Sequence, residues 1–274
     1  MVRILDYNGQ EAERTVTVAG IRSLKNSGTR LSQVTAGSAE EAHAAEAAGI
    51  EMVVCMAKAV TAVRQGSTKL FVTAAIDFDG AVTPDDLLGA AFEALTNGAD
   101  AVITARSMEC VQRLADDDVP VMGHLGFVPK KSTLYGGVRA VGKTAAEAQD
   151  LWAEFRQLEE AGAFAVECEL IPAPLMAEIN RRTALATISL GSGPDADVVF
   201  LFMSDICGEG ERKPRHARAY ADLAGLYNRI MAERVRALTE FRADIASGSF
   251  PDDDEVSTLD EAELQTFLAT LDES

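Results

Sequence analysis

The chain is poor in cysteine, and its cysteines do not form a recognisable site. There are four, with no CxxC pair and no Cys/His spacing of the kind that binds zinc. Three of them lie in or beside apolar segments, which favours small buried side chains rather than ligands. The four are Cys55, Cys110, Cys168 and Cys207. Unpaired cysteines of this kind are typical of a reducing compartment, so we expect a cytoplasmic protein.

Positive charge is also scarce. Lys and Arg number 25 against 43 Asp and Glu, which gives a net charge of -18. A chain this acidic is repelled by nucleic-acid phosphates and by anionic lipid, so we expect neither partner. No apolar run approaches the roughly 20 residues of a membrane-spanning helix. Part of the acidity lies in residues 252–274, which we interpret as a solvated acidic tail.

Hydrophobic residues, in contrast, make up 47% of the 274 residues, enough for a sizeable core. Eight short segments are continuously apolar rather than alternating, which is typical of parallel strands covered on both faces. These segments are 31–36, 51–56, 70–76, 101–105, 119–125, 164–169, 186–190 and 198–203. The chain is therefore expected to fold around a parallel sheet.

Helical patterns alternate with these segments, and several begin at Ser or Thr and end before Gly. They cover 38–48, 83–97, 107–115, 144–161 and 173–182. Repeated strand–helix units predict a (β/α)8 TIM barrel, with an open doubly wound sheet as the alternative. A long amphipathic C-terminal helix is predicted over about 214–245, and a short helix within 258–271. We expect one domain over 1–251, followed by the acidic tail.

Two of the predicted strands carry groups that transfer protons. His124 lies in segment 119–125, and Glu169 ends segment 164–169. Because the carboxyl ends of parallel strands meet at one edge of a barrel, we expect both side chains to share one small cavity. An imidazole and a carboxylate in such a place suit proton transfer near neutral pH, so both are predicted catalytic residues. His43 and His216 are expected to lie outside the site.

Three further features of the sequence give weaker evidence for a functional site. Glu167 points the same way as Glu169 in a strand, and we interpret it as structural, paired with a Lys or Arg lower in the barrel. Ser192 lies in a Gly-Ser-Gly loop after segment 186–190, where backbone N–H groups often bind an anion, so it is a candidate for substrate binding. Asp77 and Asp79 are more typical of a turn than of a metal site, which leaves Asp77 as a weak metal candidate.

Several blocks between about 95 and 251 together resemble the ketopantoate hydroxymethyltransferase family, within the phosphoenolpyruvate mutase and isocitrate lyase superfamily. They are His124-Leu-Gly-Phe-Val-Pro, Tyr135-Gly-Gly-Val-Arg-Ala-Val-Gly-Lys, Glu169-Leu-Ile-Pro, Gly191-Ser-Gly and Arg218-Ala-Tyr-Ala-Asp-Leu. The resemblance implies a barrel that assembles into homo-oligomers and acts on a small 2-oxo acid. It implies the 3-methyl-2-oxobutanoate hydroxymethyltransferase reaction of pantothenate biosynthesis, with Mg²⁺ holding the 2-oxo acid and methylenetetrahydrofolate supplying a one-carbon unit. Glu169 takes the place of the glutamate that moves the proton, and His124 that of the pocket histidine.

The resemblance does not extend to the residues that hold Mg²⁺ in this family. Cys55-Met56-Ala57 stands where the family has Gly-Asp-Ser, Ala75 where it has a metal-binding Asp, and Ile103-Thr104-Ala105 where it has Lys-x-Glu. Side chains such as Met56 and Ala75 offer no oxygen to a hard cation, so we expect the usual Mg²⁺ site to be lost. Lys58 and Arg106 directly follow two of these replaced motifs. We predict that both residues bind the substrate in place of the metal. The Arg106 guanidinium would bind the carboxylate of the 2-oxo acid.

Three functions therefore stay open. The first is a hydroxymethyltransferase-like enzyme that makes a carbon–carbon bond beside the carbonyl of a small 2-oxo acid. The second is a metal-independent lyase or hydratase of the same superfamily. The third is a catalytically silent paralogue that binds a small acid or a sister subunit. Retention of both His124 and Glu169 favours an enzyme.

Overall fold

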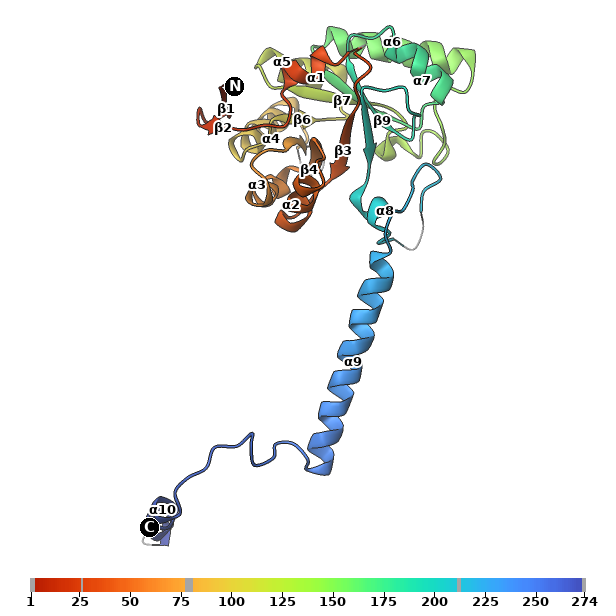
Figure 1. Ribbon diagram of the computed structural model, residues 1–274. Helices are drawn as coiled ribbons and strands as arrows, with labels where there is room; N and C mark the ends of the chain where they lie inside the picture. Colours follow the sequence, from red (N-terminus) through yellow and green to blue (C-terminus); the bar gives the residue numbers. More distant parts are fainter. Residues whose placement is uncertain (1–2, 26, 77–80, 211–212, 273–274) are drawn as a thin grey trace. The chain divides into compact units, whose positions relative to one another are not determined.

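Eight parallel strands close into a barrel in the computed structural model, which describes residues 3–25, 27–76, 81–210 and 213–272 (Figure 1). Going round the barrel, the order is β10-β3-β4-β5-β6-β7-β8-β9, so each strand pairs with the next one along the chain. All eight predicted strands and the TIM-barrel fold are confirmed, and the closed order excludes an open doubly wound sheet. The strands are β3 (Leu31–Thr35), β4 (Met52–Met56), β5 (Phe71–Ala75), β6 (Ala101–Ile103), β7 (Val121–Gly126), β8 (Ala165–Glu169), β9 (Ala186–Leu190) and β10 (Val198–Leu201).

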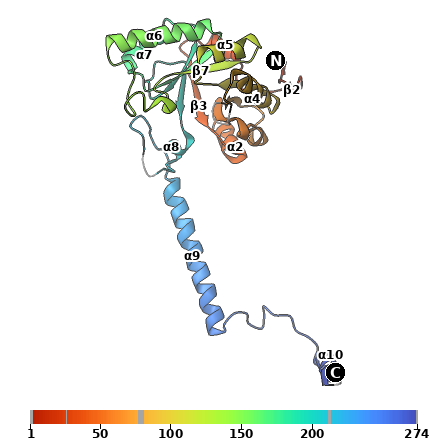
Figure 2. The ribbon, with the colours of Figure 1, turned by 180° about the vertical axis from the view of Figure 1, so that it is seen from behind.

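Helices lie outside the barrel, as Figures 1 and 2 show from opposite sides. The five predicted helices are present, and Ser38, Thr83, Ser107 and Thr144 cap four of them through their side chains. Helix α3 follows Lys58 and begins without a capping side chain, because its N-cap is Ala59. The elements are α2 (Ala39–Ala47), η1 (Ala57–Ala59), α3 (Val60–Gly66), α4 (Pro84–Thr96), α5 (Met108–Asp116), η2 (Pro129–Lys131), α6 (Ala145–Glu160), α7 (Ala173–Asn180) and α8 (Met203–Cys207).

The hydrophobic core has two layers, one inside the barrel and one between the barrel and its helices. Alternate residues of each strand enter the two layers, which is why the strands read as continuous apolar runs. Inside, Met52, Phe71 and Met122 are almost fully buried. Outside, α6 contributes Leu151, Phe155 and Leu158 at helical spacing, and each such side chain stabilises the fold by roughly 1.5–3 kcal/mol.

The segment before the barrel forms a short hairpin and a helix. Strands β1 (Ile4–Leu5) and β2 (Glu11–Ala12) pair antiparallel, and α1 (Val18–Ser23) follows. Ile21 of α1 is fully buried and belongs to the hydrophobic cluster inside the barrel. Helix α1 therefore extends the barrel's inner core.

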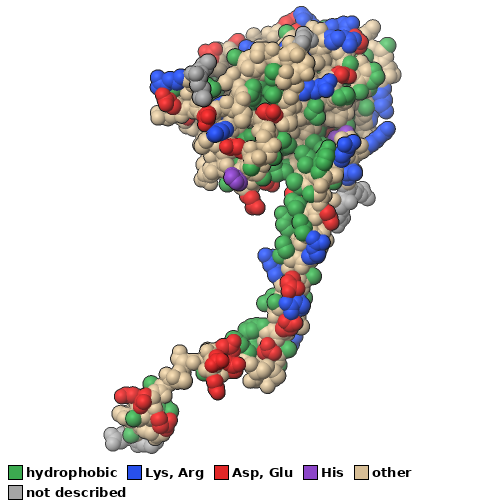
Figure 3. All heavy atoms as spheres, viewed as in Figure 1, with side chains coloured by type: hydrophobic (Ala, Val, Ile, Leu, Met, Phe, Trp, Pro, Cys, Tyr) green, Lys and Arg blue, Asp and Glu red, His purple; other side chains and the backbone are tan. Residues whose placement is uncertain are grey.

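The chain divides into two compact units, Met1–Tyr220 and Ala221–Ser274. The second contains α9 (Leu223–Ser247) and α10 (Glu261–Asp272), so the long predicted helix begins at Leu223 rather than near 214 and falls outside the barrel unit. Asp222 caps α9 by accepting a hydrogen bond from the backbone of Gly225. Apolar side chains are exposed along α9 among charged ones (Figure 3). No helix in the described part of the chain has the length and apolar character needed to cross a membrane.

Gly126 sets how closely the ends of β7 and β8 approach each other. Its φ is +85°, and a Cβ atom at this position would lie 2.3 Å from the backbone oxygen of Glu169. That oxygen accepts a hydrogen bond of 2.8 Å from the backbone N–H of Phe127. Only glycine permits both the left-handed backbone and this contact. The contact keeps the backbone beside His124 against the backbone of Glu169.

Replacing Gly126 by alanine is expected to destabilise the fold. Gly136 serves as the matched control, since its φ is +74° and a Cβ there meets nothing within 4 Å. Both variants carry the strain of a left-handed alanine, but only Gly126→Ala adds the collision with Glu169. We expect Gly126→Ala to lower the free energy of unfolding by about 1–3 kcal/mol more than Gly136→Ala, measured by urea denaturation. Equal losses in the two variants would show that the close approach has no energetic role.

Candidate active site

A cavity of about 510 Å³ opens among residues at the carboxyl ends of the barrel strands. Most of its wall is apolar, and a few polar groups converge in it, which is the usual character of a small-molecule site. The lining residues are Thr35, Ala36, Gly37, Val54, Cys55, Met56, Ala75, Ile103, Thr104, Ala105, His124, Val128, Pro129, Lys130, Glu167, Glu169, Leu190, Phe200 and Phe202.

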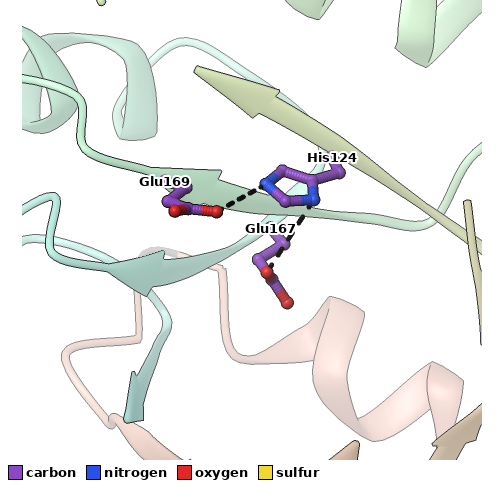
Figure 4. Close-up of side chains that lie close together, drawn as sticks. All are labelled: His124, Glu167 and Glu169. Atoms are coloured by element: carbon purple, nitrogen blue, oxygen red, sulfur yellow. Dashed lines mark hydrogen bonds and ion pairs between the residues drawn. The ribbon is translucent and has the colours of Figure 1, made fainter. Parts of the chain in front are cut away.

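His124 and Glu169 come together in this cavity, as their strand positions predict. The register of β7 and β8 pairs His124 with Glu167 and Gly126 with Glu169. His124 Nε2 lies 3.1 Å from Glu169 Oε2 (Figure 4), and both side chains are 13% exposed. Inward-facing positions on neighbouring strands thus place an imidazole and a carboxylate in hydrogen-bond contact.

The hydrogen-bond partners of His124 show which of its ring nitrogens carries a hydrogen. Nε2 also lies 3.1 Å from the backbone oxygen of Phe127. A carbonyl oxygen can only accept, so Nε2 carries a hydrogen and donates it between this carbonyl and Glu169. The other ring nitrogen, Nδ1, faces Glu167 Oε1 at 3.9 Å, which is longer than a hydrogen bond. The two edges of the ring therefore face two different carboxylates.

These contacts change the acidity of the buried groups. Burial acts to lower the pKa of His124, but the hydrogen bond to Glu169 and the charges of Glu167 and Glu169 outweigh it, and the pKa is raised above 6.5. Burial raises the pKa of Glu167, an effect that His124 opposes. The site therefore favours a protonated imidazole between two acids up to a higher pH than in water.

Glu167 requires a correction. The sequence suggests a structural pairing with a Lys or Arg lower in the barrel, but in the structure Glu167 lines the cavity and faces His124. Its side chain is only 8% exposed. The spacing of two residues from Glu169 on one strand is the signal that identifies it as a site residue. The aromatic lining residues Phe200 and Phe202 are also missed by sequence, because they carry no chemical motif.

The three residues predicted to bind substrate lie outside the cavity lining among the described residues. Lys58 is exposed on η1. The Arg106 guanidinium donates hydrogen bonds to the backbone oxygens of Ala81 and Val82. Ser192 is fully buried, where its hydroxyl donates to the Cys168 carbonyl and accepts from the backbone of Ile171. Arg106 and Ser192 thus hold loops together, and the structure gives no support to substrate binding by these three side chains.

Met56, Ala75 and Ala105 line the cavity at the positions where the family resemblance implies metal ligands. Their side chains have no oxygen atom that could bind the ion. Burial raises the pKa of the neighbouring Cys55 thiol to about 12, so the thiol is protonated in the metal-free protein. Asp77 lies outside the described residues. A different group could hold a cation, because ligand atoms of His124, Glu167 and Glu169 all lie within 4.8 Å of one another.

Comparison with solved structures shows which known proteins have a similar fold. The structure of 2,3-dimethylmalate lyase, described as a PEP mutase/isocitrate lyase superfamily member, matches 93% of this chain and all of its own, with a TM-score of 0.52 and 15% identity. A phosphonopyruvate hydrolase determined with oxalate and Mg²⁺ matches 93% of this chain and 97% of its own, with a TM-score of 0.50 and 15% identity. These likenesses concern the barrel fold alone.

Sequence comparison then gives the family. The family model of ketopantoate hydroxymethyltransferase matches residues 54–253. The 3-methyl-2-oxobutanoate hydroxymethyltransferase of Roseiflexus sp. (strain RS-1) is 32% identical over 93% of this chain and 99% of its own. The enzyme of the same name from Chloroflexus aurantiacus (strain ATCC 29366 / DSM 635 / J-10-fl) is 32% identical over 94% and 99%. The chain belongs to the ketopantoate hydroxymethyltransferase family.

The coupling of His124 to Glu169 has a measurable consequence. The imidazole titration of His124, followed by NMR, is expected to have its midpoint above 6.5, and Glu169→Gln should lower that midpoint because it removes the largest influence that raises the pKa. The NMR signals of the exposed His43 and His216 serve as the control for a general change in the protein. An unchanged His124 midpoint in Glu169→Gln would contradict the pairing.

The same raised pKa links the pair to stability. A histidine whose pKa is higher in the folded state stabilises the protein when protonated. That contribution is complete below the unfolded value of 6.5 and is lost as the pH rises through the higher folded value.

Proposed function

We propose that this protein is a 3-methyl-2-oxobutanoate hydroxymethyltransferase. Its family membership supports the reaction, and the contact of His124 with Glu169 in the cavity is the observation that carries the proposal. The reaction begins by removing a proton from the carbon next to a ketone. A carboxylate held in a largely apolar cavity, with an imidazole to orient it, is suited to that step.

In the proposed reaction, Glu169 takes the proton from C3 of the 2-oxo acid, and the electron pair of the C–H bond becomes an enolate. C3 then bonds to the methylene carbon of methylenetetrahydrofolate as the first of its two C–N bonds breaks. The second C–N bond breaks when water supplies the hydroxyl group, and the two folate nitrogens leave protonated, one with the proton taken by Glu169 and one with a proton of the water. His124 donates from Nε2 to Glu169 and so fixes the direction of its carboxylate. A divalent cation would polarise the ketone. Among the described residues, His124 and Glu167 offer ligand atoms for it, and Glu169 stays unbound as the base.

The apolar wall of the cavity supports a branched aliphatic substrate. Val54, Ile103, Leu190 and Phe200 line it and would contact an isopropyl group rather than a charged side chain. Burying such a group is favourable at roughly 25 cal/mol for each Å² removed from water. The same wall keeps water from the enolate. A cavity of about 510 Å³ also leaves room for a second reactant beside a five-carbon acid.

A metal-independent lyase or hydratase of the same superfamily is the second candidate. The observation that favours it is the set of side chains without oxygen, Met56, Ala75 and Ala105, at the positions of the family's metal ligands. Such an enzyme would use the same proton transfer by Glu169 without a cation.

We also propose that the protein acts as a homo-oligomer. Helix α9 carries exposed apolar side chains at intervals of three and four residues, which forms a stripe suited to pairing with another helix. The stripe consists of Tyr227, Met231, Val235, Leu238, Phe241 and Ile245.

Exchange of the C3 proton of 3-methyl-2-oxobutanoate for deuterium, followed by NMR, tests the proton transfer alone. The unaltered protein should catalyse exchange, and Glu169→Gln should slow it about 10²–10⁴-fold because the base is lost. Glu160→Gln changes an exposed carboxylate at the end of α6 and should leave the rate unchanged. Loss of exchange on metal removal favours the hydroxymethyltransferase, and exchange that persists favours the second candidate. No exchange under either condition would overturn the proposal.

A further inference from the structure

Glu167 is a buried acid that faces His124 without a hydrogen bond to it. The residue is 6% exposed, and within the described residues no hydrogen bond to its carboxylate is present. The nearest cationic group in that part of the chain is His124 Nδ1, 3.9 Å from Oε1. A carboxylate in an apolar wall is costly unless it is paired or binds a cation. The Glu167 carboxyl and the Nδ1 edge of His124 therefore face each other across a gap without a hydrogen bond between them.

The spacing of these two atoms suits one metal ion between them. Ligands at about 2.1 Å from a tetrahedral ion lie roughly 3.4 Å apart, so a movement of about 0.5 Å would bring Nδ1 and Oε1 into place. The gap of 3.9 Å is in contrast too long for a hydrogen bond. Both atoms belong to residues that line the cavity, so water or substrate oxygens can occupy the other coordination positions.

The Nε2 edge of the His124 imidazole has the hydrogen-bond partners that are usual for a metal-binding histidine. A histidine that binds a metal through one nitrogen usually donates its other N–H to a carboxylate or a backbone carbonyl. Nε2 of His124 has both partners, Glu169 Oε2 and the Phe127 oxygen, each at 3.1 Å (Figure 4). These contacts fix the ring with Nδ1 pointing to Glu167. They also leave Glu169 on the opposite edge of the ring, where it is free to act as a base.

We propose that His124 Nδ1 and Glu167 directly bind one divalent transition-metal ion, with Glu169 as the carboxylate that orients the imidazole. An imidazole together with a carboxylate favours Zn²⁺, Fe²⁺ or Co²⁺ over Mg²⁺, which prefers oxygen ligands alone. This site lies on β7 and β8. It is separate from the ends of β4, β5 and β6, where the family resemblance implies Mg²⁺ ligands. It goes beyond the proposed reaction, because it concerns the resting protein without substrate.

Cobalt titration of the metal-free protein tests the site directly. After removal of metals by dialysis against a chelator, Co²⁺ is added without substrate, and visible absorption and equilibrium dialysis are recorded. We expect one Co²⁺ per chain, which an equal concentration of Mg²⁺ fails to displace. His124→Ala and Glu167→Gln should weaken binding by more than about 100-fold, and Glu169→Gln by about 10–100-fold, since it orients a ligand without binding the ion.

The controls separate ligand loss from misfolding. His43→Ala and Glu160→Gln alter exposed side chains of the same kinds and should bind Co²⁺ as the unaltered protein does. Glu167→Gln keeps the size of the side chain, and circular dichroism with urea unfolding checks that each variant is folded. Nitrogen NMR of the Zn²⁺-loaded protein identifies the ligand atom, because Nε2 should keep its hydrogen.

Three results would each overturn the assignment. They are no stoichiometric Co²⁺ binding by the unaltered protein, undiminished binding by folded Glu167→Gln, and a metal on Nε2 instead of Nδ1. Each is measured without substrate. A failure here therefore leaves the C3 exchange by Glu169 to be judged on its own, and a failure of exchange leaves the metal titration valid.

Discussion

The contact between the ends of β7 and β8 is the constraint on which the site depends. Gly126 allows the backbone of Phe127 to donate to the Glu169 carbonyl, and the Phe127 carbonyl in turn accepts from His124. The backbone of Phe127 therefore hydrogen-bonds both to the imidazole of His124 on β7 and to the backbone carbonyl of Glu169 on β8. Because parallel register fixes which residues face inward, this joint sets both the distance and the tautomer of the His124–Glu169 pair.

The fold could be predicted from the sequence because its signals are local. Continuous apolar strands and Ser or Thr caps recur around the barrel, and each strand pairs with its neighbour in sequence, so little long-range information is needed. The start of α3 has a weaker local signal than the others, because its N-cap Ala59 has no capping side chain. The start of α9 was placed too early because amphipathic periodicity alone does not mark a helix end. Its boundary depends on the Asp222 cap instead.

The site could be predicted only where a side chain's role follows from its position in a strand. His124 and Glu169 follow from the ends of two strands, but the roles of Lys58 and Arg106 depend on loop paths that the sequence does not specify. Arg106 illustrates the reason, since its guanidinium satisfies two backbone carbonyls of another loop. A charged residue that follows a cavity-lining strand can therefore stabilise the neighbouring loops instead of binding a ligand. Glu167 was misread because the group that it faces, His124, lies on the neighbouring strand β7 rather than on its own strand.

The distribution of charge around the cavity connects these observations. The walls formed by the ends of β4, β5 and β6 present Met56, Ala75 and Ala105, whereas β7 and β8 present an imidazole and two carboxylates. An apolar wall opposite these groups lowers the effective dielectric constant, which strengthens their interactions with each other and with any bound ion. It also raises the cost of leaving Glu167 ionised and alone. Polarity concentrated on one side therefore favours a bound cation beside Glu167 and leaves the opposite side for the aliphatic part of the substrate.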